Sequence, residues 1–113
     1  MINKDKIQKV LINCWSSETS SKWTESNPAL GQCSVTALVI QDFYGGRLLK
    51  SKINNDWHFY NEIDGTIYDF TASQFLNELK YTYELSNRNE VLLDTSVEQY
   101  KILYKKFSEK ILA

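Results

Sequence analysis

The apolar and polar residues change their period twice along this chain, from helical spacing to alternation and back. Residues 5–15 repeat apolar side chains three and four positions apart, which predicts an amphipathic helix with Asn3 as its cap. Cys14 falls on the apolar stripe, so we expect it to be a small buried packing residue. Residues 16–26 are polar apart from Trp23, which indicates a surface loop or a lid over a site.

A nearly uncharged segment follows, Cys33–Tyr44, and a helix that is apolar on almost every side is a central, buried one. A loop containing Pro28 and Gly31 precedes this helix, and a double glycine ends it. Cys33 then lies at the helix N-terminus, where backbone N–H groups favour a thiolate. We therefore take Cys33 as the leading candidate for a functional residue.

Aromatic and β-branched residues predict strands over residues 47–53, 57–63 and 66–71. Asp64-Gly65 lies between the last two and has the composition of a two-residue hairpin turn. Because the strands are short and the last two are joined directly, the expected sheet is small and antiparallel.

The hairpin fixes the register of its two strands by counting outward from the turn. Ile63 pairs with Thr66, and the same count brings His58 and Asp69 to one face as diagonal neighbours, about 7 to 8 Å apart. Alternation assigns the other residues of the hairpin to its two faces. One face holds His58, Tyr60, Glu62, Ile67, Asp69 and Thr71, and the other holds Trp57, Phe59, Asn61, Tyr68 and Phe70.

The remainder of the chain has helical patterning. We expect a helix over residues 72–79 capped by Thr71, a loop at residues 87–89, and a long helix that follows a capping box at residues 95–98. The apolar stripe of the long helix consists of Val97, Tyr100, Tyr104, Phe107 and Ile111. Together these elements predict an α+β fold over one domain, residues 1–113. In it a cysteine-bearing helix packs on a small antiparallel sheet, flanked by N- and C-terminal helices.

Composition removes several classes of function. A chain of 113 residues with a net charge of −1 has no electrostatic attraction for nucleic acid or an anionic membrane. No stretch has the apolar length of a signal peptide core or a membrane span, so we expect a soluble, cytoplasmic protein. Two cysteines without metal-ligand spacing indicate free thiols rather than a disulfide framework or a zinc site, and we expect no cofactor. Composition leaves the oligomeric state open.

Cys33, His58 and Asp69 come in the order that a thiol triad requires, and His58 is the single histidine of the chain. A cysteine nucleophile needs a base that shares its proton and a third group that orients the base. Each residue also has a structural interpretation, as a packing cysteine, a satisfied strand histidine and a helix-capping aspartate. A metal site from the same three residues is the weaker alternative, because no further cysteine or histidine adjoins them.

Other parts of the predicted site are assigned by their position in the chain. The backbone N–H of Cys33, together with a side-chain amide from Gln32 or Asn27, would form an oxyanion site. The aromatic residues expected to flank a shallow substrate site are Trp23, Trp57 and Tyr60.

Three separated segments resemble the YunG-like family of small bacterial proteins. They are Asn27–Gly46 around the cysteine, His-Phe-Tyr-Asn at residues 58–61, and Tyr-Asp-Phe-Thr-Ala-Ser-Gln-Phe at residues 68–75. The resemblance implies a bacterial cytoplasmic protein and brings no activity with it, since the family is uncharacterised.

The order of Cys33, His58 and Asp69 is also similar to the papain-like and transglutaminase-like core, in which a helix carrying the cysteine packs on an antiparallel sheet carrying the other two residues. Papain-like proteases place a glutamine about six residues before the nucleophile; Asn27 holds that offset in this chain, and Gln32 is its rival for the role. This resemblance implies cysteine hydrolase chemistry, and the small domain leaves little room to bind long peptides.

Two hypotheses of function follow. The first is a minimal cysteine hydrolase or acyl transferase that acts on a small amide or thioester, either a small molecule or a short peptide. The second is a non-catalytic binding or interaction module on the same scaffold, in which His58 and Asp69 are structural hydrogen-bonding partners. Fast alkylation of Cys33 near neutral pH that depends on His58 would distinguish the first from the second.

Overall fold

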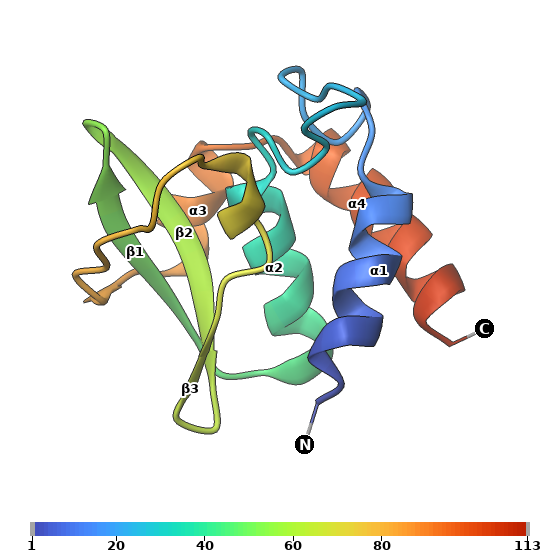
Figure 1. The fold of residues 1–113 in the computed structure, drawn as a ribbon. Helices are drawn as coiled ribbons and strands as arrows, with labels where there is room; N and C mark the ends of the chain where they lie inside the picture. The colour runs from blue at the N-terminus through green and yellow to red at the C-terminus, as the bar shows by residue number, and fades with distance from the viewer. Residues whose placement is uncertain (1, 113) are drawn as a thin grey trace.

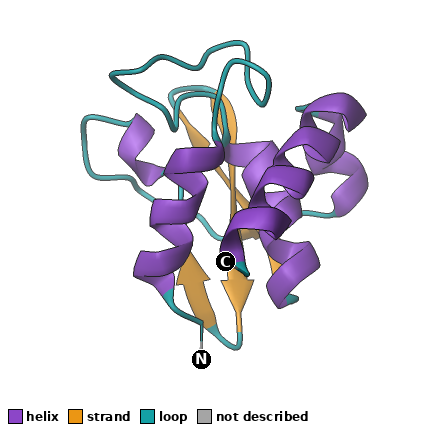
Figure 2. Ribbon diagram, turned by 90° about the vertical axis from the view of Figure 1, so that its right-hand side faces the viewer, coloured by secondary structure: helices purple, strands orange, loops and turns teal. Residues whose placement is uncertain are grey.

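A computed structural model describes residues 2–112 and has the α+β architecture that the sequence predicts, with one helix between a sheet and a pair of outer helices (Figures 1 and 2). Helix α2 packs on the sheet through one side and on the outer helix α4 through the other, and α1 packs on α4 and shares an apolar cluster with both. The elements in chain order are α1 (Lys4–Cys14), α2 (Cys33–Tyr44), β1 (Arg47–Ile53), β2 (Asp56–Ile63), β3 (Thr66–Tyr68), the short 3-10 helix η1 (Ala72–Gln74), β4 (Glu84–Leu85), α3 (Arg88–Leu93) and α4 (Val97–Ile111).

The sheet is antiparallel, with the strand order β3-β2-β1-β4. The predicted register of the hairpin is confirmed, since Ile63 pairs with Thr66 across a turn in which Asp64 and Gly65 both have positive φ. Strand β3 nevertheless ends at Tyr68 rather than at residue 71. The backbone leaves the ladder there because the Asp69 carboxylate accepts the N–H of a residue two positions on, which turns the chain locally.

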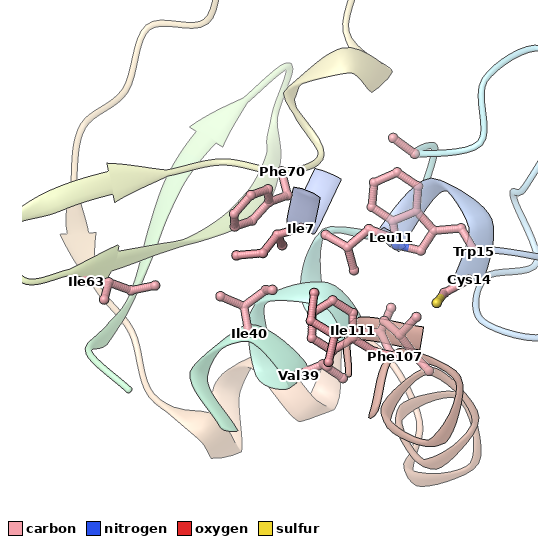
Figure 3. Packing of buried hydrophobic residues seen from close by; sticks show 13 residues of the cluster. Ile7, Leu11, Cys14, Trp15, Val39, Ile40, Ile63, Phe70, Phe107 and Ile111 are labelled. Carbon is pink, nitrogen blue, oxygen red and sulfur yellow. The ribbon is translucent and has the colours of Figure 1, made fainter. Parts of the chain in front are cut away.

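Helix α2 is buried from Cys33 to Ile40, as its nearly uncharged sequence predicts. Its outer side meets α1 and α4 in an apolar cluster that includes Leu11, Val39 and Phe107 (Figure 3). A second cluster joins its other side to β1, β2 and α3. Packing on opposite sides of one helix leaves it little freedom to shift, which positions its N-terminus for the site described below.

Helix α1 agrees with the sequence prediction in its N-terminal cap and in its buried cysteine. The side chain of Asn3 caps the helix by accepting the backbone N–H of Lys6. Cys14 is fully buried in the cluster between α1 and α4, and burial raises the pKa of its thiol. Cys14 is therefore a packing residue, and its thiol is protected from reagents in solvent.

Two predictions about the C-terminal half are wrong. The expected helix over residues 72–79 is reduced to the single turn of η1, because Leu76 finds no apolar surface to cover and remains fully exposed. The expected loop at residues 87–89 is instead the start of α3, whose N-cap Asn87 accepts the backbone N–H of Glu90. An asparagine-rich segment can begin a helix as well as form a loop.

The buried face of α4 agrees only in part with the predicted apolar stripe. Phe107 and Ile111 are buried as expected, but Leu103 replaces Tyr104 as the third buried residue, and Val97 is half exposed. Tyr104 packs its ring on Phe43 at a centroid distance of 5.2 Å at the edge of the contact. Within residues 2–112, no helix combines the length and apolarity needed to cross a bilayer.

Candidate active site

A cavity of about 690 Å³ opens where the loop before α2 faces the start of β2 and η1. Residues from both halves of the chain line it, so its shape depends on the complete fold. Those that matter for the chemistry are Gly31, Cys33, Trp57, His58, Gln74 and Phe75.

His58, which lines this cavity, forms a close buried pair with Asp69. The Nε2 atom of His58 lies 2.7 Å from Oδ2 of Asp69, and only 2% and 6% of the two side chains are exposed. A carboxylate accepts a hydrogen bond, so Nε2 carries a proton and Nδ1 is left to face another group. The predicted neighbour relation between the two residues is thus confirmed at hydrogen-bonding distance.

Cys33 occupies the first position of α2 and lines the same cavity as His58. Its side chain is 9% exposed, whereas that of Cys14 is inaccessible. No well-aligned partner for Nδ1 of His58 exists among residues 2–112. Hydrogen bonds between a nucleophile and its base are often poorly aligned without substrate.

The protonation of His58 is set by opposing effects. Burial alone would lower its pKa, but the hydrogen bond and charge of Asp69, together with the nearby Cys33 thiol, raise the pKa of His58 to about 9. The imidazole is therefore predominantly protonated at neutral pH. A protonated histidine beside a cysteine favours the thiolate form and can later return its proton to a leaving group.

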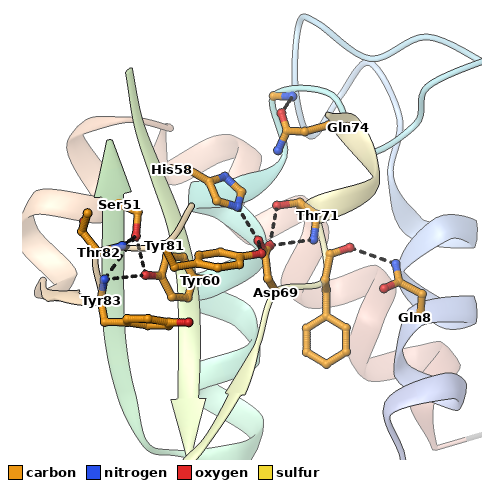
Figure 4. A network of polar contacts seen from close by, with 12 residues as sticks. Gln8, Ser51, His58, Tyr60, Asp69, Thr71, Gln74, Tyr81, Thr82 and Tyr83 are labelled. Carbon is orange, nitrogen blue, oxygen red and sulfur yellow. Dashed lines mark hydrogen bonds and ion pairs between the residues drawn. The ribbon is translucent and has the colours of Figure 1, made fainter. Parts of the chain in front are cut away.

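Asp69 holds His58 in place from below and is itself held by three other groups (Figure 4). Oδ1 accepts the backbone N–H and the hydroxyl of Thr71, and Oδ2 accepts the hydroxyl of Tyr81 at 2.7 Å as well as His58. Burial and the adjacent Asp69 carboxylate raise the pKa of Tyr81, so it remains a donor. The carboxylate is thereby fixed in one orientation.

Aromatic rings confine the imidazole on two sides. Tyr60 lies stacked beside it at 5.9 Å between centroids, and Phe75 meets it edge-on at 5.0 Å. The Tyr60 hydroxyl shares a 2.5 Å hydrogen bond with Ser51 Oγ, and both oxygens accept the backbone N–H of Tyr83 (Figure 4). These contacts attach the segment after η1 to the sheet. The ring of His58 consequently has little room to rotate.

Of the aromatic residues predicted to flank the substrate, only Trp57 lines the cavity, where it is 37% exposed. The ammonium group of Lys50 lies 4.1 Å from the centroid of its ring. Tyr60 is fully buried as part of the support for His58, and Trp23 packs against the core cluster. The predicted contacts of Tyr60 and Trp23 with substrate are corrected on this ground, since neither lines the cavity.

The two amides predicted as oxyanion donors point elsewhere. Gln32 is fully buried, and its Nε2 donates to the backbone oxygen of Ser16 at 3.4 Å. The side-chain nitrogen of Asn27 donates to the backbone oxygen of Gln74 at 3.2 Å. Neither residue lines the cavity, so the prediction is corrected because both amides hold loops together.

Residues 16–26 form a wall of the cavity through Ser20, Ser21 and Lys22. The wall lies close to Gly31, where φ is +74° and a Cβ atom would be 2.4 Å from Ser20 Oγ. A glycine is needed here both for the backbone angle and for the close approach. The loop therefore belongs to the site as one of its sides.

Sequence reasoning missed Gln74 and Tyr81, which approach the site from the segment after Asp69. The sequence places Gln74 in the expected helix over residues 72–79, and no periodic pattern includes Tyr81. Their only sequence signal is closeness in the chain to the predicted Asp69. Across residues 2–112, no three histidine, cysteine or acidic side chains gather as metal ligands do.

Comparison with known proteins gives two matches. A family model described as YunG protein matches residues 3–112. A protein of Bacillus subtilis (strain 168), described as an uncharacterized protein YunG, is 48% identical over 104 residues, which cover 92% of this chain and 90% of that protein. No solved structure matches the chain significantly.

Proposed function

We propose that this chain, which belongs to the YunG family, is a small cysteine hydrolase or acyl transferase that acts on an amide or thioester. The observation that carries the proposal is the single histidine. It lines the same cavity as Cys33, a buried aspartate holds one of its ring nitrogens, and the other ring nitrogen has no hydrogen-bond partner among residues 2–112. Cys33 is the nucleophile, His58 is the acid and base, and Asp69 orients His58.

The reaction would use the two protonation states of His58 in turn. The Cys33 thiolate attacks the carbonyl carbon of the substrate, forming a C–S bond while the carbonyl π electrons move to oxygen. As the tetrahedral intermediate collapses, the bond to the leaving group breaks and Nδ1 of His58 gives that group its proton. Neutral His58 then takes a proton from water or an acceptor, which attacks the acyl-cysteine and releases the thiolate.

The size and composition of the cavity favour a small substrate. A volume of about 690 Å³ is in the range of ordinary small-molecule sites. Trp57 offers an exposed aromatic surface on its wall. We extend the proposal to a papain-like arrangement of helix and sheet, and to the bacterial cytoplasm, where two free thiols would remain reduced.

The alternative is a binding module on the same scaffold. One observation favours it, namely that Cys33 is only 9% exposed. In that case the pair of His58 and Asp69 would serve only to anchor the segment after η1 to β2.

Cysteine alkylation separates the two proposals. We expect iodoacetamide to modify Cys33 near neutral pH much faster than Cys14, and His58→Gln to slow the reaction at Cys33 by about tenfold or more. Peptide mass spectrometry resolves the two sites. Continued protection of Cys14 shows that the variant is folded. Slow labelling of Cys33 that does not depend on His58 would remove the catalytic proposal.

A further inference from the structure

We infer that the side-chain amide of Gln74 is the oxyanion donor of this site, an inference that rests on the proposed thiol chemistry. Its Nε2 atom is buried and has no hydrogen-bond partner among residues 2–112. Gln74 lines the cavity together with Cys33 and His58. A donor of this kind is available to a ligand without any other hydrogen bond having to break.

The orientation of the amide is fixed by the protein. The backbone N–H of Gly31 donates to Oε1 of Gln74 at 3.2 Å. A carbonyl oxygen can accept this bond and an amide nitrogen cannot, so the N–H₂ group must occupy the opposite side. In Figure 4 the side-chain nitrogen of Gln74 lies on the side of the amide away from that bond.

An unsatisfied buried donor is costly, at about 1–3 kcal/mol, and native proteins retain few of them. Within residues 2–112, four buried side-chain atoms have no partner: Trp23 Nε1, Gln32 Oε1, His58 Nδ1 and Gln74 Nε2. Only the last two belong to residues that line the cavity. Their coincidence indicates that the missing partner of Gln74 is a substrate atom that approaches Cys33.

Two hydrogen bonds from the loop before α2 hold Gln74 close to the chain segment that carries Cys33. Gly31, which binds its Oε1, is two residues from Cys33, and Asn27 binds its backbone oxygen from the same loop. The first turn of α2 has no side-chain cap in the described chain, which leaves the N–H of Cys33 as a second donor. Asn27, predicted as a donor itself, instead positions the residue that donates.

The role assigned to Gln74 involves no transfer of protons. When the Cys33 thiolate adds to a carbonyl carbon, the π electrons move onto the carbonyl oxygen, and the Gln74 N–H donates a hydrogen bond to that developing anion. Removal of one such donor from an acyl-transfer site typically slows the reaction by about 10²- to 10³-fold. Alkylation by iodoacetamide displaces iodide at a saturated carbon and develops no oxyanion.

These two reactions at one sulfur provide the test. The probe for acylation is a small acyl thioester, with acyl-Cys33 measured by mass spectrometry, and the probe for nucleophilicity is iodoacetamide. Gln74→Glu retains an acceptor for Gly31 but loses the donor, and Gln74→Met loses both. We expect acylation to fall about 100-fold in each variant, while alkylation changes by less than about threefold in Gln74→Met, which adds no charge beside the thiolate.

The matched control is Gln41→Met, because Gln41 lies outside the cavity, near the end of α2 opposite to Cys33, and its Nε2 donates to the backbone oxygen of Gly46. It should leave both rates near those of the wild type. Acylation that survives in both Gln74 variants, or that falls only in step with alkylation, overturns the role of Gln74 and leaves the proposed function standing. A wild type that alkylates but never acylates overturns the proposed function, and the role of Gln74 with it.

Discussion

Asp69 shows how much of this site depends on a single side chain. Its two oxygens accept four hydrogen bonds, from His58, Tyr81 and both the backbone and hydroxyl of Thr71. A carboxylate has about four acceptor positions, so none remains for water or a cation. The charge of Asp69 is therefore directed to its protein neighbours, and chiefly to His58.

Tyr81→Phe should make His58 more basic. The Tyr81 hydroxyl donates a hydrogen bond to Oδ2 of Asp69, the oxygen that His58 also contacts. Without that hydrogen bond, Oδ2 carries more negative charge and stabilises the protonated imidazole more strongly. We expect the pKa of His58, about 9 in the wild type, to rise in this variant. Stability should fall by about 1–2 kcal/mol. The single histidine gives one resonance, which can be followed by NMR across the titration.

Tyr83→Phe is the matched control, because Tyr83 contacts the network through its backbone N–H and its side chain is 55% exposed. It should leave the midpoint and the stability unchanged. A midpoint that falls in Tyr81→Phe would show that this hydroxyl mainly orients Asp69 toward His58.

Sequence reasoning reached the His58–Asp69 contact because hairpin register depends on counting from a recognisable turn. It failed for the amides, since local position does not determine where a long side chain points. Gln32 and Asn27 are adjacent to Cys33 in the chain but bind other loops, while Gln74 arrives from a distant segment.

Among the elements, those with strong periodic patterns were predicted well, and the short ones were not. Helix α2 and strand β1 match their predicted bounds because burial and alternation are both visible in the sequence. Strand β4 has two residues and α3 has six, too few to show a period. Strand β4 pairs with β1 and α3 packs on α2, so contacts outside their own few residues complete both elements.

The turn between α2 and β1 depends on two glycines of different importance. Both have positive φ, but a Cβ atom on Gly46 would lie 2.1 Å from the backbone oxygen of Glu62, whereas one on Gly45 would meet nothing within 4 Å. We expect Gly46→Ala to destabilise the protein by at least about 2 kcal/mol more than Gly45→Ala. Urea unfolding measures both, and equal losses would contradict this difference.

At the scale of the whole molecule, α2 carries the site and the core together. The same helix supplies Cys33 at one end and packs on both sides along its length. Displacing its N-terminus would disturb both apolar clusters, so the position of the thiol is linked to the stability of the fold. The free energy of unfolding should therefore change when the protonation of the site changes.

Stability should decrease as pH rises from about 6.5 to about 9. The pKa of His58 is raised from 6.5 to about 9 on folding, so the folded protein binds a proton that the unfolded chain has lost in this interval. The contribution is complete below 6.5 and disappears as pH passes 9. The contribution of His58 to the free energy of unfolding is about 2–4 kcal/mol, because a difference of one in pKa corresponds to about 1.4 kcal/mol.

Urea unfolding at several pH values tests this, with His58→Gln as the reference. The variant should be less stable than the wild type at low pH and show a flatter profile over the same interval. Identical slopes in the two proteins would assign the pH dependence to other groups. Measurements should end near pH 9, because the buried Cys14 thiol begins to contribute above that value.

The cavity wall draws on segments that are far apart in the chain, from Ser20 to Gln99. A molecule bound there would bridge the loop before α2, the strand β2 and the helix α4 at once. Binding to the folded state alone raises the melting temperature, whatever reaction follows. Ligands of this protein can thus be sought by thermal shift across a metabolite library, before any substrate is known and even in a variant that lacks Cys33.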